Sequence, residues 1–540
     1  DLAAIWEEVL RQAPVGATDD FFALGGNSLS ASQVVARVTQ RLDARLGIRD
    51  MFAHPTVRGL ATAIGRIAGR GLPPITPAAP QADYAVSNAQ RRFWIQDRLA
   101  DARAGNAHPA SFLIEGPLDV AALGRAFDAL IARHEILRTV FVDTRGEPRQ
   151  RVLAPGAGGF ALRVTALAPG ADAASALRAI EQDESAARMD LAAGPLLRAH
   201  LVALGPDRHV CLCSMHHTIT DGWSVGVMLN DLAALYDAAV AGVEAPLAPL
   251  PIQYKDYAAW QNRVTAGPEA ESMRAYWRQK LQGVPALRLP ADIRKAAPFT
   301  RAVADFTIDQ DIAATLTAAA RRHGATLYMA MLACLKVLLY RHTAQEDFAV
   351  GTPVSARPLP DLEPQIGPYL NILALRDRVS GADTLGDVLR RVRETTLDGF
   401  AHQLYPFDRI VEDLRIKPAA GRNPIFDAGF TLQNQHDVQA RETSRHLRMT
   451  EMARAAGAFD DPEAATDLWL VARTGDSGLA VQVVYNGARF RPERLDRLSR
   501  DFVAIASAAA ASLDTRVDAV ALASSPQPRG GRAITIDLGL

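Results

Sequence analysis

Two adjacent histidines, His216 and His217, are the side chains of this sequence best suited to do chemistry. An imidazole can take up a proton or orient a nucleophile near neutral pH. An apolar run at residues 210–215, typical of a buried strand, precedes the pair, and Asp221 and Gly222 form a turn after it. Neighbouring side chains of an extended backbone point to opposite sides, so at most one histidine faces a substrate. The Asp221 carboxylate can hold the loop or the ring through charged hydrogen bonds.

The segments on either side of the histidines predict a strand, a loop and a helix. Apolar residues recur at helical spacing after the turn: Val225, Leu229, Leu232 and Leu235. The histidines therefore lie where a rigid scaffold can present loop side chains to a cleft. A pair of structural histidines in a turn is the alternative. A zinc site at His216, His217 and Asp221 is disfavoured, because adjacent histidines cannot readily bind one ion and no Cys or Glu lies at ligand spacing.

A serine at the start of another predicted helix, Ser28, is the second chemical candidate. It follows a Gly-Gly turn at residues 25–26 and precedes apolar residues at helical spacing: Val35, Val38 and Leu42. A hydroxyl at a helix start lies beside unpaired backbone N–H groups and the positive end of the helix dipole, which suits an attached phosphate. The alternative is that Ser28 only caps its helix.

The composition favours a large chain without an electrostatic footprint for nucleic acid or an anionic membrane. The 540 residues include 59 Lys and Arg against 60 Asp and Glu, and 49% are hydrophobic. The three cysteines, Cys211, Cys213 and Cys334, imply no disulfide framework. Without a disulfide framework we expect a reducing, cytoplasmic location, and we expect no secretory signal. The longest apolar stretch, residues 326–340, is too short to span a bilayer and predicts a core helix.

Patterns along the chain divide it into a helical bundle at 1–66, a Pro-rich linker at 67–82, and alternating strands and helices beyond. The chain begins inside a helical pattern without Met, so we expect a piece of a longer polypeptide. A poorly packed tail is expected at 526–540. The predicted helices are 2–11, one from about 29, one across 57–64, 120–133, 312–322, 326–340 and 492–508; the strands are 210–215, 348–350 and a hairpin of 468–472 with 479–485.

The histidine segment resembles the His-His-x-x-x-Asp-Gly core of the condensation domains of nonribosomal peptide synthetases. Further segments resemble the other motifs of that family, in the right order: 87–94, 133–139, 254–260, 366–371, 402–408 and 422–426. Residues 20–29 resemble the modification site of a peptidyl carrier protein. The resemblance implies an α/β (α+β) fold, in which a small helical carrier precedes a two-lobed pseudo-dimer like chloramphenicol acetyltransferase, with lobes at 83–255 and 256–525.

The resemblance also implies the chemistry. Ser28 would carry 4'-phosphopantetheine, attached by a phosphopantetheinyl transferase, and His217 would face the tunnel to orient the attacking amine or to take its proton. The partners would be an upstream adenylation domain and a downstream carrier, and we expect the fragment to be monomeric. The carrier of this chain would deliver the donor group, because a linker of about 16 residues reaches at most about 50 to 60 Å.

The remaining residues of the motif are expected to support the loop. His216 would point into the fold and hydrogen-bond the backbone, and Asp221 would pair with an arginine, either Arg138 or Arg357. Gly222 allows the turn, and its N–H can face the cleft. Trp223 lines the tunnel or packs, and Ser224 is expected to cap the next helix.

Other members of the same superfamily are the alternatives. An epimerisation domain shares the histidines and the upstream carrier, but its motif has Ser-Trp where this chain has Trp223-Ser224. A heterocyclisation domain would have aspartates in place of the histidines. A non-catalytic docking module is disfavoured by the intact His217 and Gly222. The chain departs from the family at Ile372, where Thr is common, and at 368–369, so its substrates stay open.

Overall fold

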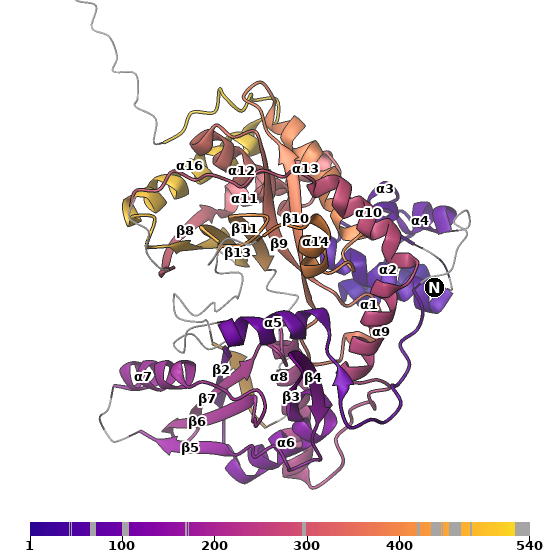
Figure 1. The fold of residues 1–540 in the computed structure, drawn as a ribbon, viewed down its shortest axis with the longest axis vertical. Coiled ribbons are helices and arrows are strands. Elements are labelled where there is room, and N and C mark those ends of the chain that lie inside the picture. The colour runs from indigo at the N-terminus through magenta and orange to yellow at the C-terminus, as the bar shows by residue number, and fades with distance from the viewer. Residues whose placement is uncertain are drawn as a thin grey trace, which may run out of the picture.

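The structure is a computed structural model, and a set of residues that covers most of the chain is described in it. These are residues 1–42, 44, 46–64, 72–99, 107–167, 170, 172–293, 299–417, 422–433, 444, 446–452, 466–475 and 478–523. The predicted tail at 526–540 and part of the predicted linker, 67–71, lie outside them. The chain forms two α/β lobes with a small group of helices beside them (Figure 1).

The first 64 residues form a helical bundle, as the sequence predicted. Its helices are α1 (Leu2–Leu10), α2 (Ser28–Leu42), α3 (Ile48–Ala53) and α4 (Val57–Ile64). Trp6 and Phe21 are fully buried at its centre, and their rings meet edge to face with centroids 4.9 Å apart. The sequence analysis missed α3, because six residues are too few to show a helical period.

The N-terminal lobe is built on a five-stranded sheet with the strand order β12-β2-β7-β6-β5. Its strands are β2 (Ala107–Glu115), β5 (Leu162–Ala166), β6 (Leu197–Gly205), β7 (Arg208–His216) and β12 (Arg448–Glu451). Central β7 pairs antiparallel with both β2 and β6. The lobe also contains a three-stranded sheet of β1 (Tyr84–Ala85), β4 (Glu147–Val152) and β3 (Thr139–Thr144).

Helices cover the larger sheet of this lobe, and one apolar cluster joins β7 with α6 and α8. The helices are α5 (Asn88–Leu99), α6 (Val120–Arg133), η1 (Glu135–Arg138), α7 (Ala173–Ala186), α8 (Gly222–Ala241) and α9 (Tyr254–Ala266). The predicted helix 120–133 is confirmed, and the Asp119 carboxylate caps it. The predicted lobe boundary falls at the start of α9, whose buried Tyr257 and Trp260 belong to the cluster of the N-terminal lobe; the boundary itself stays a prediction.

The C-terminal lobe is built on a six-stranded sheet with the order β10-β9-β11-β13-β14-β8. The strands are β8 (Arg301–Asp309), β9 (Asp347–Ser355), β10 (Leu370–Arg378), β11 (Ala428–Gln433), β13 (Leu468–Gly475) and β14 (Gly478–Asn486). The helices are α10 (Glu269–Leu281), α11 (Gln310–Arg322), α12 (Leu327–Thr343), η2 (Pro360–Leu362), α13 (Leu385–Ala401), α14 (Phe407–Leu414) and α16 (Pro492–Ala511). The predicted hairpin is the antiparallel pair β13–β14, and the helices predicted at 312–322, 326–340 and 492–508 are α11, α12 and α16.

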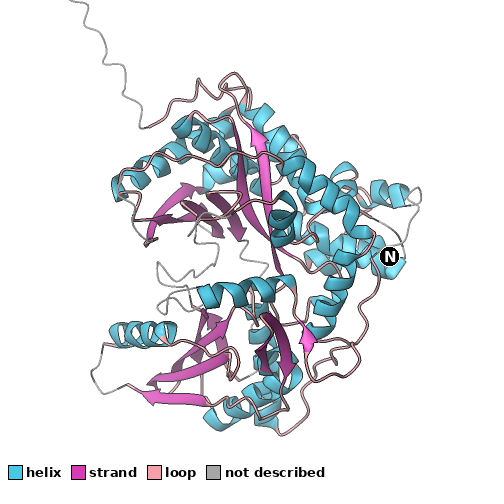
Figure 2. Ribbon diagram, viewed as in Figure 1, coloured by secondary structure: helices cyan, strands magenta, loops and turns pink. Residues whose placement is uncertain are grey.

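One segment of the C-terminal lobe crosses into the other lobe. Strand β12 pairs antiparallel with β2 and extends the five-stranded sheet. Figure 2 shows this sheet and the six-stranded sheet as separate layers, each with its own helices. Because β12 lies far from β2 along the chain, this strand pairing links the C-terminal half of the chain to the sheet of the N-terminal lobe.

One described helix, α8, is long and apolar enough to cross a membrane, with a mean hydropathy of 1.2. Helices α11 and α12 would also qualify if they were taken as one span, although they are bent by 103°. The buried residues of α8 pack against β7 and α6 within the protein core. We therefore interpret α8 as a core helix of the N-terminal lobe.

Candidate active site

The two histidines lie where β7 ends and before α8 begins, as the sequence predicted. Strand β7 ends at His216, and α8 begins at Gly222. Every residue of the connecting loop, 217–221, is buried. A short loop between two core elements holds its side chains in one arrangement, which catalytic geometry requires.

His216 points into the fold. Its Nδ1 accepts a hydrogen bond from the backbone N–H of Thr218 at 3.1 Å and lies 2.9 Å from the Thr218 hydroxyl. Its Nε2 lies 3.6 Å from a carboxylate oxygen of Asp97 on α5. The nearby His216 imidazole, helped by Arg188, lowers the pKa of the Asp97 carboxyl. The contact with the Thr218 N–H is the backbone hydrogen bond expected of His216, whose structural role stays a prediction.

The His217 ring stacks on the aromatic ring of Phe93 from helix α5. The ring of Phe93 on α5 lies 5.2 Å from the His217 ring, with 19° between their planes. The guanidinium of Arg92 lies 5.0 Å from the centre of the same phenyl ring. Both residues belong to the segment 87–94, so the sequence analysis found the segment but did not assign this contact. The stacking fixes the plane of the His217 imidazole and hence the directions of its two nitrogens.

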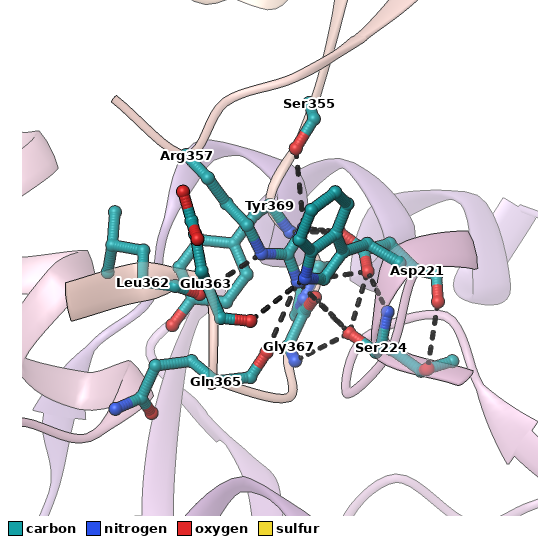
Figure 3. A network of polar contacts seen from close by, with 12 residues as sticks. Asp221, Ser224, Ser355, Arg357, Leu362, Glu363, Gln365, Gly367 and Tyr369 are labelled. Carbon is teal, nitrogen blue, oxygen red and sulfur yellow. Dashed lines mark hydrogen bonds and ion pairs between the residues drawn. The ribbon is translucent and has the colours of Figure 1, made fainter. Parts of the chain in front are cut away.

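Asp221 joins the two lobes. Its carboxylate accepts five hydrogen bonds, from Ser224 N (2.8 Å) and Oγ (2.6 Å), from Arg357 Nη1 (2.7 Å) and Nη2 (3.1 Å), and from Tyr369 N (3.0 Å). Asp221 and Ser224 come from the N-terminal lobe, whereas Arg357 and Tyr369 come from the C-terminal lobe (Figure 3). We call these four residues the inter-lobe network.

Two aromatic rings also pack near the guanidinium of Arg357. Its centre lies 4.2 Å from the Tyr369 ring and 5.6 Å from the Trp223 ring. Its side chain is 3% exposed, and that of Asp221 is 7% exposed. A pair so buried depends on both charges, because either one alone would be left without a counter-charge.

The structure chooses between the two candidate arginines, and it corrects one prediction. Arg357 is the partner of Asp221, whereas Arg138 donates to the carbonyl of Leu153 and lies 3.7 Å from Glu135. Ser224 is not the cap of α8. The cap is Asp221, whose carboxylate accepts from the Ser224 N–H, because a carboxylate at this position reaches the first free N–H groups of the helix.

The other two residues of the motif lie at the border of the site. Gly222 is exposed, and a Cβ built on it would meet no heavy atom within 4 Å, so open space lies beside its backbone. The half-buried Trp223 packs against the C-terminal lobe and donates its indole N–H to the carbonyl of Glu363 at 2.9 Å. This is a packing contact with a polar component, and the role of Trp223 in lining a tunnel stays a prediction.

One of the departures from the family pattern, Tyr369, belongs to this network. Tyr369 packs between Tyr254 and Tyr257, with ring centroids 4.9 and 4.6 Å away. Ile372 is buried in β10. The sequence analysis treated Tyr369 only as a departure, and nothing local in the sequence signals that its backbone N–H reaches Asp221.

Ser28 is the first residue of α2. The Asn27 side chain accepts from the N–H groups of Leu29 and Ser30, at 2.8 and 3.0 Å, and so caps the helix. The Ser28 hydroxyl is buried and has no hydrogen-bond partner in the described part of the chain. A hydroxyl that is not used for capping fits the attachment of phosphopantetheine, and the alternative role of Ser28 as the cap is not supported.

The described residues contain no group of three or more His, Cys, Asp or Glu side chains that could hold a metal ion. The three cysteines are buried and free, and the sulfur atoms of Cys211 and Cys213 lie 3.9 Å apart.

Comparison with known proteins gives two family matches. Residues 80–529 match the Condensation domain family, and residues 1–64 match the Phosphopantetheine attachment site family. One of the plipastatin synthase subunits of Bacillus subtilis (strain 168) is 40% identical over 478 residues, which are 86% of this chain and 18% of that protein. Tyrocidine synthase 3 of Brevibacillus parabrevis is 36% identical over 520 residues, 94% of this chain and 8% of that protein. The chain therefore spans less than a fifth of these relatives.

Solved structures share the two-lobed fold. The X-domain from teicoplanin biosynthesis superimposes with a TM-score of 0.75 at 26% identity, covering 83% of this chain and 100% of that one. The first condensation domain of the calcium-dependent antibiotic synthetase, solved with a substrate analogue, gives a TM-score of 0.67 at 24% identity over 82% of this chain and 100% of that one.

Proposed function

The chain belongs to the Condensation domain family of nonribosomal peptide synthetases and carries a phosphopantetheine carrier domain before it, and from this premise we propose that it forms amide bonds. In this proposal, an acyl or peptidyl group moves from the carrier of this chain to an amine on a downstream carrier. An upstream adenylation domain would supply the donor, and a phosphopantetheinyl transferase would convert Ser28.

The observation that carries the proposal is the arrangement of the loop at residues 217–221. The inter-lobe network holds the Asp221 end of this loop against the C-terminal lobe, and Phe93 fixes the plane of the His217 ring. His217 is therefore held with its imidazole in one orientation. An amine that is already neutral needs correct placement more than it needs a base. Placement alone can lower the activation barrier by up to about 7 to 11 kcal/mol.

Two roles of His217 predict different pH profiles. If His217 only holds the amine in place, the rate follows the protonation of the amine. If His217 takes the proton of the amine as the tetrahedral intermediate forms, the rate also falls as the imidazole becomes protonated. A comparison of rate–pH profiles for acceptors of different amine pKa separates the two roles.

Ser28 and the bundle supply the donor side. When bound to Ser28, phosphopantetheine presents the donor carbonyl as a thioester on a long arm. The Ser28 hydroxyl, which is not used for capping, provides the attachment point at the start of α2. The carrier bundle contacts the C-terminal lobe through α2 and α3. These contacts support delivery of the donor group by the carrier of this chain rather than by a distant carrier.

The test of this function is single-turnover amide formation with His217→Ala. We expect a strong loss of amide product, with loading of Ser28 unchanged, because the two sites are on different domains. His323→Ala, at an exposed histidine after α11, is the matched control and should react like the wild type. A His217→Ala protein with the wild-type rate would contradict the proposed role.

Epimerisation is the second candidate, because an epimerisation domain would also follow a carrier and use the same two histidines. The same experiment, run without an acceptor, distinguishes the two by chiral analysis of the residue released from Ser28. Retention of the loaded configuration supports condensation, whereas a mixture of configurations on Ser28 supports epimerisation.

A further inference from the structure

One short segment of the C-terminal lobe contacts carrier helix α2. This docking segment, residues 359–365, contains η2 and lies in the connection between β9 and β10. The Glu363 carboxylate receives both Nη atoms of Arg37 from carrier helix α2, each at 2.7 Å. Gln40, one turn further along α2, donates to Asp361 at 3.3 Å. Paired guanidinium–carboxylate contacts of this type are strong and directional.

The Arg37–Glu363 ion pair is much less exposed than the ion pairs that Arg49 of the bundle makes with the C-terminal lobe. The two side chains are 11% and 19% exposed. The second contact joins Arg49 of α3 to Glu394 and Asp398 of α13, at 3.0 and 2.5 Å, and these side chains are 39% to 47% exposed. An exposed ion pair contributes little because water screens it, so Arg37 and Glu363 make the more specific contact.

The docking segment also contacts the residues that hold the histidine loop. The carbonyl of Glu363 accepts from the indole N–H of Trp223, two residues after Asp221. Arg357, which grips the Asp221 carboxylate, donates to the carbonyl of Leu362 at 3.2 Å and to that of Gln365 at 3.3 Å. Figure 3 shows the backbone groups of Leu362 and Gln365 converging on Arg357. The same short segment therefore touches the carrier on one side and the inter-lobe network on the other.

From this double contact we infer that Glu363 is a positioning residue that couples docking of the carrier to the geometry of the active-site loop. Docking places Arg37 on the Glu363 carboxylate, and the carbonyl of the same residue orients Trp223 at the start of α8. Undocking removes the charge partner of Glu363, so the segment that supports Trp223 and Arg357 is free to shift. The inference rests on the proposed function and extends it: the docked carrier would raise the rate of the site as well as deliver the donor.

The test separates delivery from coupling by using a donor that needs no carrier. In a Ser28→Ala background, an aminoacyl N-acetylcysteamine thioester supplies the donor, and a separate loaded carrier supplies the amine. We expect Arg37→Gln to lower kcat by at least about fivefold, the lower end of typical coupling between sites, with little change in KM for the free donor. Arg37 lies on the carrier, so a purely structural or delivery role would leave this reaction unchanged.

Arg41→Gln is the matched control. Arg41 lies one turn further along the same helix and pairs with Glu8 of the carrier, at 2.7 Å, rather than with the condensation lobes. This variant should keep the wild-type kcat. A wild-type kcat for Arg37→Gln with the free donor would overturn the inference.

A second measurement does not depend on activity. The protein is labelled with 5-fluorotryptophan, and the Trp223 resonance is assigned from its loss in Trp223→Phe. We expect Arg37→Gln and Glu363→Gln to shift this resonance and Arg41→Gln to leave it in place. If no protein forms amide but the Trp223 resonance shifts, the proposed function fails and the coupling stands. If amide forms normally and the resonance does not move, the coupling fails and the proposed function stands.

Discussion

Replacing Asp221 with Asn tests whether the inter-lobe network holds the two lobes together. The carboxylate is 7% exposed and accepts both Nη atoms of Arg357, which is 3% exposed. Asparagine keeps the shape and one acceptor oxygen for the cap of α8, but it removes the charge. The guanidinium of Arg357 is then buried without a counter-charge, which typically costs about 3 to 5 kcal/mol.

The size of the effect follows from these values. In a domain larger than 250 residues, each kcal/mol lowers Tm by roughly 2 °C or less, so we expect Tm to fall by about 5 °C. Removing the second charge as well should recover part of this loss, because a buried pair replaced by apolar groups of similar volume is often close to neutral. The double variant Asp221→Asn, Arg357→Met should therefore be more stable than Asp221→Asn alone.

The assay is thermal unfolding of the wild type, both single variants and the double variant, followed by circular dichroism. Glu346→Gln is the control, because Glu346 and its partner Arg378 are 48% and 71% exposed and their contact contributes about 0 to 1 kcal/mol at most. An unchanged Tm for Asp221→Asn, or strictly additive effects in the double variant, would refute the reasoning.

Two further predictions follow from the carrier and from the first histidine. Ser28→Ala should gain no mass when it is incubated with coenzyme A and a phosphopantetheinyl transferase, whereas the wild type gains one group; a modified Ser28→Ala protein would show that another residue is the attachment point. The pKa of Asp97 lies below its unfolded value of about 3.9 because of His216, so its contribution to stability is present above about pH 4 and is lost as the pH falls through the folded pKa. The urea midpoint of the wild type should therefore fall toward that of Asp97→Asn between pH 6 and pH 3, and parallel curves would count against the contact.

Local patterns predicted the elements that carry the candidate site. The apolar run of β7 and the helical spacing of α8 are signals within one window of sequence, and they placed His217 on the loop between them. The partner of Asp221 could not be chosen in this way, because Arg357 is 136 residues away and only the packing of the lobes brings it near. For the same reason, no pattern predicted that β12 joins the sheet of the other lobe.

The misassigned cap shows a different limit. Asp221 and Ser224 are both good capping residues, and the sequence favours neither by type. The structure decides between them because the Asp221 carboxylate serves Arg357 and the N–H of Ser224 together. The stacking of Phe93 on His217 also depends on tertiary packing, since α5 and the loop are distant in sequence.

The direction of transfer is the central claim, and one measurement tests it most directly. Ser28 is loaded with one aminoacyl group, and a separate downstream carrier is loaded with a different amino acid. After a single turnover, both carriers are analysed by mass spectrometry. The proposed function predicts the dipeptide on the separate carrier and an emptied arm on Ser28. A dipeptide that remains attached to Ser28 would show that the carrier of this chain is the acceptor, and it would contradict the proposal.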